Sequence, residues 1–238
     1  MQRYFSKELI NDYFILNNDD KYHITTVMRM KVNDKIEIVY NEELYIAFIE
    51  DINNLKVKKI KKEEVTTDNR PNVVLCIPLL KEQKMDYILQ KATELGVNEI
   101  VPVILERSII KLDTEKEDKK IARWDKIVKE ASEQSKRVDI PIIRRIHKLD
   151  ELKYFNGLKL VCSTVEKDNN IKKVLRKAKD TIIFVIGPEG GISPKEEEKL
   201  NEMGYISTSL GSRIMRVETV PLYIMSVVNY EFMEWFEC

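Results

Sequence analysis

Residues 181–198 join a buried-strand pattern to a helix start through a glycine-rich turn. Residues 181–186 are apolar and mostly β-branched, which predicts a strand covered on both faces of an α/β sheet. Gly187, Gly190 and Gly191 follow at once. Because glycine has no Cβ and tolerates positive φ, these residues let the backbone approach a small molecule at the carboxyl end of the strand.

A helix is predicted directly after this turn. Ser193 is a suitable N-cap, Pro194 is favoured at the first position, and Glu196 completes a capping box. The turn matches neither Gly-x-Gly-x-x-Gly nor Gly-Lys-Ser/Thr, and the glutamates at residues 196–198 would repel an anion. A neutral or cationic ligand therefore fits better than a nucleotide triphosphate. Taken alone, the turn is equally typical of a tight connection that binds nothing.

The composition is that of an ordinary globular protein, with 43% hydrophobic and 34% charged residues among 238. No run of 18 apolar residues and no apolar amino-terminal region occurs, so we expect a cytoplasmic protein without membrane contact. Cys76, Cys162 and Cys238 are odd in number and widely spaced, which favours neither disulfides nor a zinc site. His23 and His147 are too far apart in the sequence to suggest a metal site.

The chain is predicted to form two domains. Strand patterns at residues 35–40, 44–51 and 55–62 indicate a small β-rich domain over residues 1–69, and polar residues 63–71 resemble a linker. In residues 70–238 strand and helix patterns alternate, which predicts a mainly parallel α/β sheet. Its strands are expected at residues 73–78, 99–105, 140–146, 158–163, 181–186 and 205–209.

Three helices have distinct apolar patterns. Residues 84–95 carry one apolar face and end before Gly96, a suitable C-terminal cap. Residues 121–138 carry a second such stripe. Residues 220–236 are apolar around most of the helix, so this helix is either central or part of a subunit interface.

Charge gives little support for nucleic-acid binding, since forty basic and forty acidic side chains give a net charge of zero. An RNA-binding protein nevertheless needs only a basic face. Residues 55–62 are the best local candidate, because five lysines alternate with apolar residues there. A solvated edge strand protected by its lysines explains this pattern equally well.

A second glycine loop follows a predicted strand at residues 209–219. Two such loops at the carboxyl ends of two strands can hold one ligand between them. One interpretation is that Arg213 and Arg216 face an anionic substrate and that Glu218 is their ion-pair partner. A surface Arg/Glu pair without a function is the alternative.

Two motifs resemble the paired signature of the RsmE family, the small-subunit ribosomal RNA uridine-N3 methyltransferases of the SPOUT superfamily. They are Gly-Pro-Glu-Gly-Gly at residues 187–191 and Leu-Gly-Ser-Arg-Ile-Met-Arg-Val-Glu-Thr at residues 210–219. Further similarity at residues 3–5, 23–29, 90–97 and 130–135 extends the resemblance over nearly the whole chain. The chain departs from the family at Tyr22, often histidine, at Asn33, often glycine, and at Val220-Pro221, where a small residue is usual.

The resemblance implies a PUA-like β-barrel that binds RNA at residues 1–69. At residues 70–238 it implies a SPOUT-type α/β methyltransferase domain whose carboxyl-terminal part forms a deep trefoil knot around S-adenosylmethionine. It further implies a homodimer through the knotted region, acting on 16S ribosomal RNA or the small ribosomal subunit, without a metal. Because N3 of uridine is a Watson–Crick atom, the target base must be unpaired or extruded.

The resemblance also implies roles for individual residues. Arg216 is expected to contact RNA or the developing uridine anion, and Glu218 to orient Arg216 or accept the proton. The expected RNA contacts are Arg3, His23, Arg29 and Arg213. The residues expected to hold the cofactor are Thr164, Ile186, Gly187, Glu189, Gly190, Gly191, Ser209, Leu210, Gly211, Ile214 and Met215.

Two other functions remain open at this point. One is a SPOUT methyltransferase that acts on another RNA position or on transfer RNA, because the cofactor loops do not report the target atom. The other is a noncatalytic RNA-binding protein that keeps the fold without using the cofactor. The intact glycines in both loops argue against the second.

Overall fold

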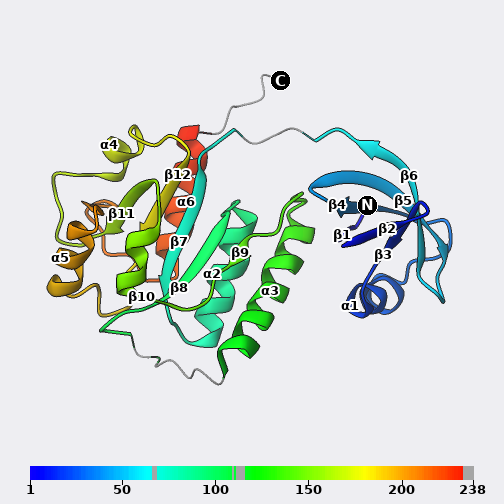
Figure 1. The fold of residues 1–238 in the computed structure, drawn as a ribbon, viewed down its shortest axis with the longest axis horizontal. Helices are drawn as coiled ribbons and strands as arrows, with labels where there is room; N and C mark the ends of the chain where they lie inside the picture. Colours follow the sequence, from blue (N-terminus) through cyan, green and yellow to red (C-terminus); the bar gives the residue numbers. More distant parts are fainter. Residues whose placement is uncertain (66–68, 109, 111–115, 233–238) are drawn as a thin grey trace. The chain divides into compact units, whose positions relative to one another are not determined.

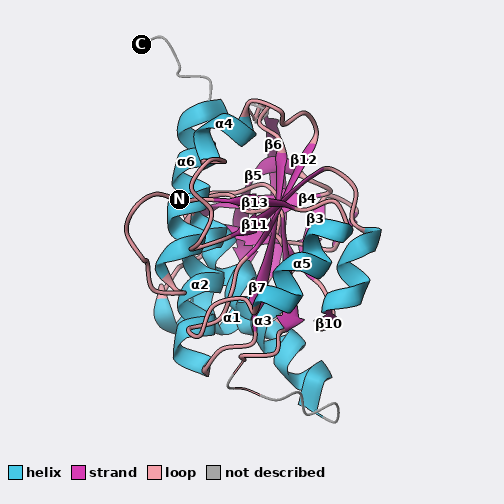
Figure 2. Cartoon of the chain, turned by 90° about the vertical axis from the view of Figure 1, so that its left-hand side faces the viewer, coloured by secondary structure: helices cyan, strands magenta, loops and turns pink. Residues whose placement is uncertain are grey.

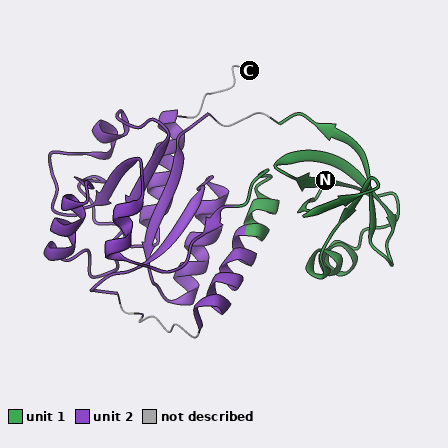
Figure 3. Cartoon of the chain, in the orientation of Figure 1, with its two compact units in different colours: residues 1–67, 129–140 green, residues 68–128, 141–238 purple. Residues whose placement is uncertain are grey.

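The computed structural model describes residues 1–65, 69–108, 110 and 116–232 (Figure 1). Its internal contacts divide the chain into two units, residues 1–67 with 129–140 and residues 68–128 with 141–238 (Figure 3). The sequence had placed residues 129–140 in the second domain. The end of helix α3 (Glu117–Gln134) instead belongs to the first unit, because it contacts residues 1–67, which are far from it in the sequence.

The first unit is a six-stranded sheet in the order β1-β4-β5-β6-β3-β2. Neighbouring strands are antiparallel except for the parallel pair β1 and β4. The strands predicted at residues 35–40, 44–51 and 55–62 are confirmed within one residue as β4, β5 and β6. The elements are β1 (Arg3–Phe5), β2 (Glu8–Ile10), β3 (Tyr13–Ile15), α1 (Asn18–Tyr22), the π-helix η1 (His23–Val27), β4 (Lys35–Tyr40), β5 (Glu43–Asp51) and β6 (Lys56–Glu63).

The turn before β4 explains one departure from the RsmE pattern. Asn33 has φ of 73°, in the left-handed region that glycine favours and asparagine tolerates. The backbone N–H of Asn33 donates to the Ile49 carbonyl on β5 at 2.8 Å. An asparagine therefore serves this position without a change in the turn.

A buried polar cluster lies where the end of α3 meets the rest of the first unit. Lys129 forms ion pairs with Asp20 and with Glu133, the latter at 3.1 Å. The Tyr4 hydroxyl lies 3.0 Å from Nδ1 of His23. Burial raises the pKa of Glu133 to about 7, although the charge of Lys129 opposes the shift, and the nearby charge of Asp20 adds to it. Burial, followed by the charges of Glu133 and Asp20, also raises the pKa of Tyr4.

The second unit is built on a parallel sheet in the order β10-β8-β7-β12-β11-β13, with β9 paired to β8. Its strands are β7 (Asn72–Pro78), β8 (Glu99–Ile104), β9 (Ile142–Ile143), β10 (His147–Lys148), β11 (Leu158–Cys162), β12 (Thr181–Val185) and β13 (Ile206–Thr208). Its other elements are α2 (Glu82–Glu94), most of α3, the 3₁₀ helix η3 (Leu149–Tyr154), α4 (Ile171–Leu175), α5 (Pro194–Glu202) and α6 (Thr219–Phe232).

Helices cover both faces of this sheet, as the continuous apolar strands require. On β12, Ile182 and Phe184 face one core cluster and Ile183 and Val185 the other, because side chains alternate along a strand. The first cluster includes residues of α2, α3, α4 and α6, and the second includes residues of η3 and α5. Figure 2 shows α2, α4 and α6 on one side of the strands and α5 on the other.

Most strands of the predicted α/β sheet are confirmed, but their lengths differ. The strand expected at residues 140–146 is reduced to Ile142–Ile143, and β10 was not predicted. Both lie at the edge of the sheet, where short strands leave little sequence periodicity. Gly96 after α2 has φ of 87°, as expected for a helix cap.

The helix predicted at residues 220–236 is described as α6, and residues 233–236 lie outside the described residues. One side of α6 is buried in the core through Pro221, Ile224, Met225 and Val228. Tyr223 and Tyr230 remain exposed in this chain. No helix in the described part of the chain is long and apolar enough to cross a membrane.

Glu133→Gln should flatten the dependence of stability on pH. A carboxyl whose pKa is higher in the folded than in the unfolded state binds a proton on folding, so its contribution to stability is lost as pH rises from about 4.5 through 7. We expect the free energy of unfolding to fall between pH 5 and 8 by about 2 kcal/mol more in the unsubstituted protein than in the variant. Urea unfolding at both pH values measures this difference. Glu130→Gln, at an exposed position of the same helix, is the control, and parallel profiles for all three proteins would contradict the prediction.

Candidate active site

The two glycine loops lie at the same edge of the parallel sheet. One follows β12 and the other follows β13, and β11 pairs with both strands. The loop after β11, which contains Thr164, therefore lies between them. Backbone bonds join it to β13 and the loop that follows, from Ser163 N to the Thr208 carbonyl at 3.0 Å and from Ser209 N to the Asn169 carbonyl at 2.7 Å. The strand order thus gathers all the predicted cofactor-binding residues at one edge.

The first glycine loop, residues 186–193, folds tightly on itself. A Cβ at Gly187 would lie 2.9 Å from both the backbone nitrogen and Cγ1 of Ile192, so a side chain there would displace the turn. Gly191 has φ of 72°, and its N–H donates to the Pro188 carbonyl at 2.8 Å. The backbone of the turn therefore requires glycine at positions 187 and 191 whether or not a ligand binds there.

The capping box predicted for α5 is confirmed, with Pro194 at its first position. Ser193 Oγ also donates to Oε2 of Glu106, in the loop after β8, at 2.7 Å. The Glu106 backbone N–H in turn donates to Oε1 of Glu196 at 2.7 Å. Glu196 is therefore buried in a network that holds the helix start, and it does not line an open ligand site.

Two basic residues that sequence reasoning missed hold the first glycine loop. Arg107, after β8, donates from Nη1 to the Gly190 carbonyl at 2.9 Å. Lys84, on α2, lies 2.9 Å from Oε1 of Glu189 and 3.2 Å from Oε2 of Glu218. Lys84 therefore connects the two glycine loops. No local pattern marks it, because its role depends on β7 lying beside β12.

The charges of this trio stabilise one another. Hydrogen bonds to Glu189 and Glu218 raise the pKa of Lys84. The Lys84 ammonium holds the pKa of the Glu189 carboxyl below its usual range. The pKa of Glu218 is lowered first by a backbone hydrogen bond at Glu218 itself and then by Lys84, with a smaller contribution from the charge of Arg216. Both carboxylates are therefore ionised at neutral pH.

The second glycine loop exposes its basic residues. Arg213 and Arg216 are exposed, while Val217 is buried and anchors the loop to the core. Ile214 is 86% exposed, an unusual position for an isoleucine. Glu218 pairs with Lys84 of α2 at 3.2 Å and not, as the sequence had predicted, with these arginines.

The predicted RNA contacts of the first unit differ in exposure. Arg3 is only 6% exposed, with Nε 2.9 Å from Oε2 of Glu37 and Nη1 donating to the carbonyls of Lys136 and Arg137. These contacts give Arg3 a structural role. His23 is partly exposed and lies beside Tyr4, whereas Arg29 is exposed with φ of 52°. Their contacts with RNA stay predictions.

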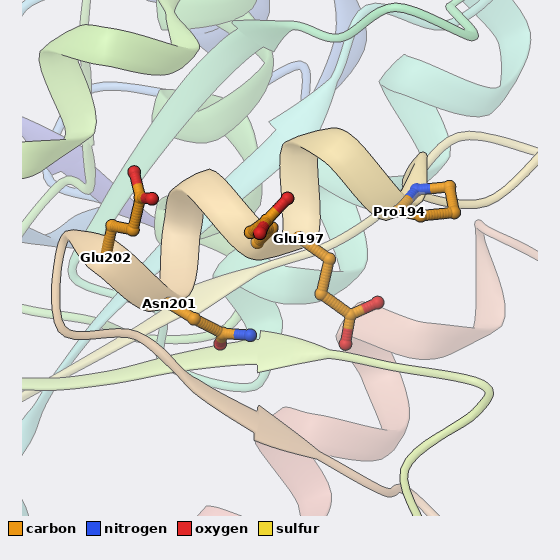
Figure 4. A pocket seen from close by; sticks show the side chains of 5 residues that line it. Pro194, Glu197, Asn201 and Glu202 are labelled. Atoms are coloured by element: carbon orange, nitrogen blue, oxygen red, sulfur yellow. The ribbon is translucent and has the colours of Figure 1, made fainter.

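Other chemistries find little support in the described residues. No group of three or more His, Cys, Asp or Glu side chains there is placed to hold a metal ion. Burial raises the pKa of Cys162 to about 12 and also raises that of Cys76, so neither thiol is ionised at neutral pH. A shallow depression of about 570 Å³ on α5 is acidic, which opposes an anionic ligand (Figure 4). It is lined by Pro194, Glu197, Glu198, Asn201 and Glu202.

Family models match both parts of the chain, "RNA methyltransferase domain" at residues 67–229 and "RNA methyltransferase PUA domain" at residues 16–62. The ribosomal RNA small subunit methyltransferase E of Bacillus subtilis is 34% identical to this chain over 97% of both sequences. The chain belongs to the RsmE family. The enzyme of the same name from Mesomycoplasma hyopneumoniae is also 34% identical, over 95% of this chain and 98% of that protein.

The fold of the RsmE family extends over the whole chain. The crystal structure of a ribosomal RNA small subunit methyltransferase E from Neisseria gonorrhoeae, bound to S-adenosyl methionine, superposes with a TM-score of 0.88. It is 28% identical and covers 98% of both chains. The predicted α/β methyltransferase fold with a PUA-like domain is therefore confirmed.

Lys84→Met should loosen both glycine loops, because it removes the cation shared by Glu189 and Glu218. Ion pairs between partly exposed side chains contribute only modestly to stability, so we expect amide hydrogen exchange in residues 187–191 and 209–218 to become about fivefold faster, not more. Exchange measured by mass spectrometry tests this expectation. Lys91→Met, which removes the ion pair with Glu94 on the same helix, is the control. Equal exchange in the two variants would show that Lys84 does not connect the loops.

Proposed function

We propose that this chain methylates N3 of a uridine in 16S ribosomal RNA with S-adenosylmethionine as the methyl donor. The observation that carries the proposal is the pair of glycine loops at one edge of the sheet, connected through Lys84, in a chain of the RsmE family. The bound S-adenosyl methionine of the Neisseria gonorrhoeae structure supports the choice of donor.

The chemistry of the two loops fits this donor. Their glycines leave backbone groups accessible, and Leu210, Ile214 and Met215 supply apolar surface from the second loop. The start of α5 is occupied by its own capping carboxylate, Glu196, so it does not offer the bare helix terminus that a phosphate prefers. Lys84 is shared by the two ionised carboxylates Glu189 and Glu218, so this group of three keeps an excess of negative charge, which suits a sulfonium better than a nucleotide phosphate.

S-adenosylmethionine supplies an electrophilic methyl group. Uridine N3 must lose its proton to attack this carbon, and negative charge then spreads over the base. Arg216, which is exposed in the second glycine loop, contacts that charge or the adjoining RNA in this proposal. Glu218 is a weak base because its pKa is lowered. It is therefore better suited to orient Arg216 and Lys84 than to accept the proton of N3.

The same proposal includes the larger assembly. The carboxyl-terminal part of the second unit forms a deep trefoil knot around the cofactor, and the sheet of the first unit closes into a PUA-like barrel that binds RNA. Two copies form a homodimer through the knotted region, and the enzyme acts in the cytoplasm. The exposed Tyr223 and Tyr230 on α6 support a subunit contact, because aromatic side chains are enriched in interfaces.

Nucleoside mass spectrometry tests the activity. The protein is incubated with S-adenosylmethionine and small ribosomal subunits, or their RNA, from cells that lack this methylation. We expect N3-methyluridine at one position of 16S RNA. Methylcytidine or a 2′-O-methyl product would overturn the uridine-N3 assignment. If calorimetry detects no binding of S-adenosylmethionine at millimolar concentration, the protein is instead a noncatalytic RNA-binding protein.

Arg216→Ala should lower kcat/KM for the RNA by about 100-fold, the usual effect of removing a donor that stabilises developing negative charge. Binding of S-adenosylmethionine should change little, because the proposed contact is with RNA. Steady-state methylation and calorimetry measure the two effects. Arg213→Ala is the matched control on the same loop, and its effect should be smaller. Unchanged turnover in Arg216→Ala would remove this residue from the mechanism.

A further inference from the structure

A second basic surface lies on α4 and the residues that follow it. Five cationic side chains occur within eight residues and all are exposed. We call this set the α4 basic surface. It consists of Lys172, Lys173, Arg176, Lys177 and Lys179.

Helical periodicity fixes the direction of this surface. Ile171, Val174 and Leu175 are buried in the core of the second unit. The residues between and after them are therefore turned outward. Asn170 caps the helix by accepting a hydrogen bond from the Lys173 backbone N–H at 2.9 Å. The cations thus project from a fixed segment of the fold.

The charge of the α4 basic surface is not neutralised by ion pairs. Among the described residues, no carboxylate forms an ion pair with any of its five cations. One weaker electrostatic contact is present: backbone N–H groups, chiefly of Asn169 and Asp168, hold the pKa of Glu166 below its usual range, and the charge of Lys173 makes a smaller contribution.

The lysines of β6, which the sequence favoured as a basic face, are different. Lys58 pairs with Glu50 at 3.6 Å and Lys61 pairs with Glu63 at 2.6 Å. Lys62 pairs with Glu43 at 2.6 Å. Much of the positive charge of β6 is therefore compensated within its own sheet. The alternative given for that pattern, a solvated strand rich in lysines, agrees better with these contacts.

The α4 basic surface begins beside the candidate active site. The backbone N–H of Ile171, at the start of α4, donates to the Ser209 carbonyl in the second glycine loop at 3.0 Å. After α4 the chain reaches a depression of about 510 Å³ at the amino ends of β11 and β12, to which Lys177 and Lys179 contribute. Asp180 also lines this depression and offsets part of its positive charge.

We propose that the α4 basic surface binds the phosphate backbone of the ribosomal RNA substrate next to the methylated base. This proposal rests on the proposed function. In a chain of zero net charge, binding of a polyanion needs a local excess of cations, and this surface provides one. Flexible lysines bind phosphates as point charges, so the surface positions the RNA without reading its sequence.

The test neutralises three cations in the variant Lys172→Gln/Arg176→Gln/Lys177→Gln. Binding of purified 16S RNA is measured as a function of salt concentration. If each cation contacts one phosphate, the slope of log K against log salt should fall by about 2, and Kd should rise at least about tenfold at 0.15 M salt. KM for the RNA should rise in parallel while kcat at saturating RNA is retained.

The control variant Lys148→Gln/Lys153→Gln/Lys195→Gln removes the same charge from exposed lysines of the same unit, outside α4. It should keep the salt slope. Unchanged S-adenosylmethionine binding and thermal unfolding in both variants show that the fold is intact.

Three results would overturn the proposal. The first is an unchanged salt slope in the α4 variant, and the second is an equal loss of RNA affinity in the control variant. The third is a defect in binding assembled subunits but not naked RNA, which would assign the surface to a ribosomal protein. Product analysis of the unsubstituted protein distinguishes a failure of this proposal from a failure of the proposed function. If it produces N3-methyluridine while the α4 variant binds RNA normally, only the role of α4 is wrong.

Discussion

The parallel pairing of β11 with both β12 and β13 holds the candidate active site together. Each strand leaves the sheet at the same edge, so loops that are separate in the sequence become neighbours. The apolar residues that alternate along β12 fix its register by burying both faces. A strand order in which β11 did not lie between β12 and β13 would separate the two glycine loops, and they could not hold one ligand between them. The position of both loops thus depends on the packing of the sheet.

Lys84 adds an electrostatic connection to this framework. Its ammonium is shared by Glu189 of the first loop and Glu218 of the second. Because both carboxylates are partly exposed, these ion pairs contribute only modestly to stability. Arg107 and Glu106, in the loop after β8, hold the first glycine loop and the start of α5. The candidate site is therefore supported by α2 and by the loop after β8, as well as by its own turns.

The zero net charge of the chain conceals an uneven distribution of cations and anions. Lysines of β6 are compensated by glutamates of the same unit, and α5 carries an acidic depression. The cations of α4 stand apart because their helix has only one buried side and no acidic residue within it. A polyanionic substrate would be attracted to α4 and repelled by α5. The local distribution of charge, and not the net charge of zero, therefore bears on where an RNA can bind.

The sequence alone determined the elements whose signals are local. The strand at residues 181–186, the capping box of Ser193 and Glu196, and the three strands β4 to β6 follow from periodicity and helix-end chemistry, and the paired glycine motifs were sufficient to suggest the family. Only the tertiary structure decided the partners: Glu218 pairs with Lys84 instead of an arginine, Arg3 is buried against Glu37, and the end of α3 belongs to the first unit. These outcomes depend on which strands lie side by side, and strand order is set by the burial of whole faces, which no local pattern records.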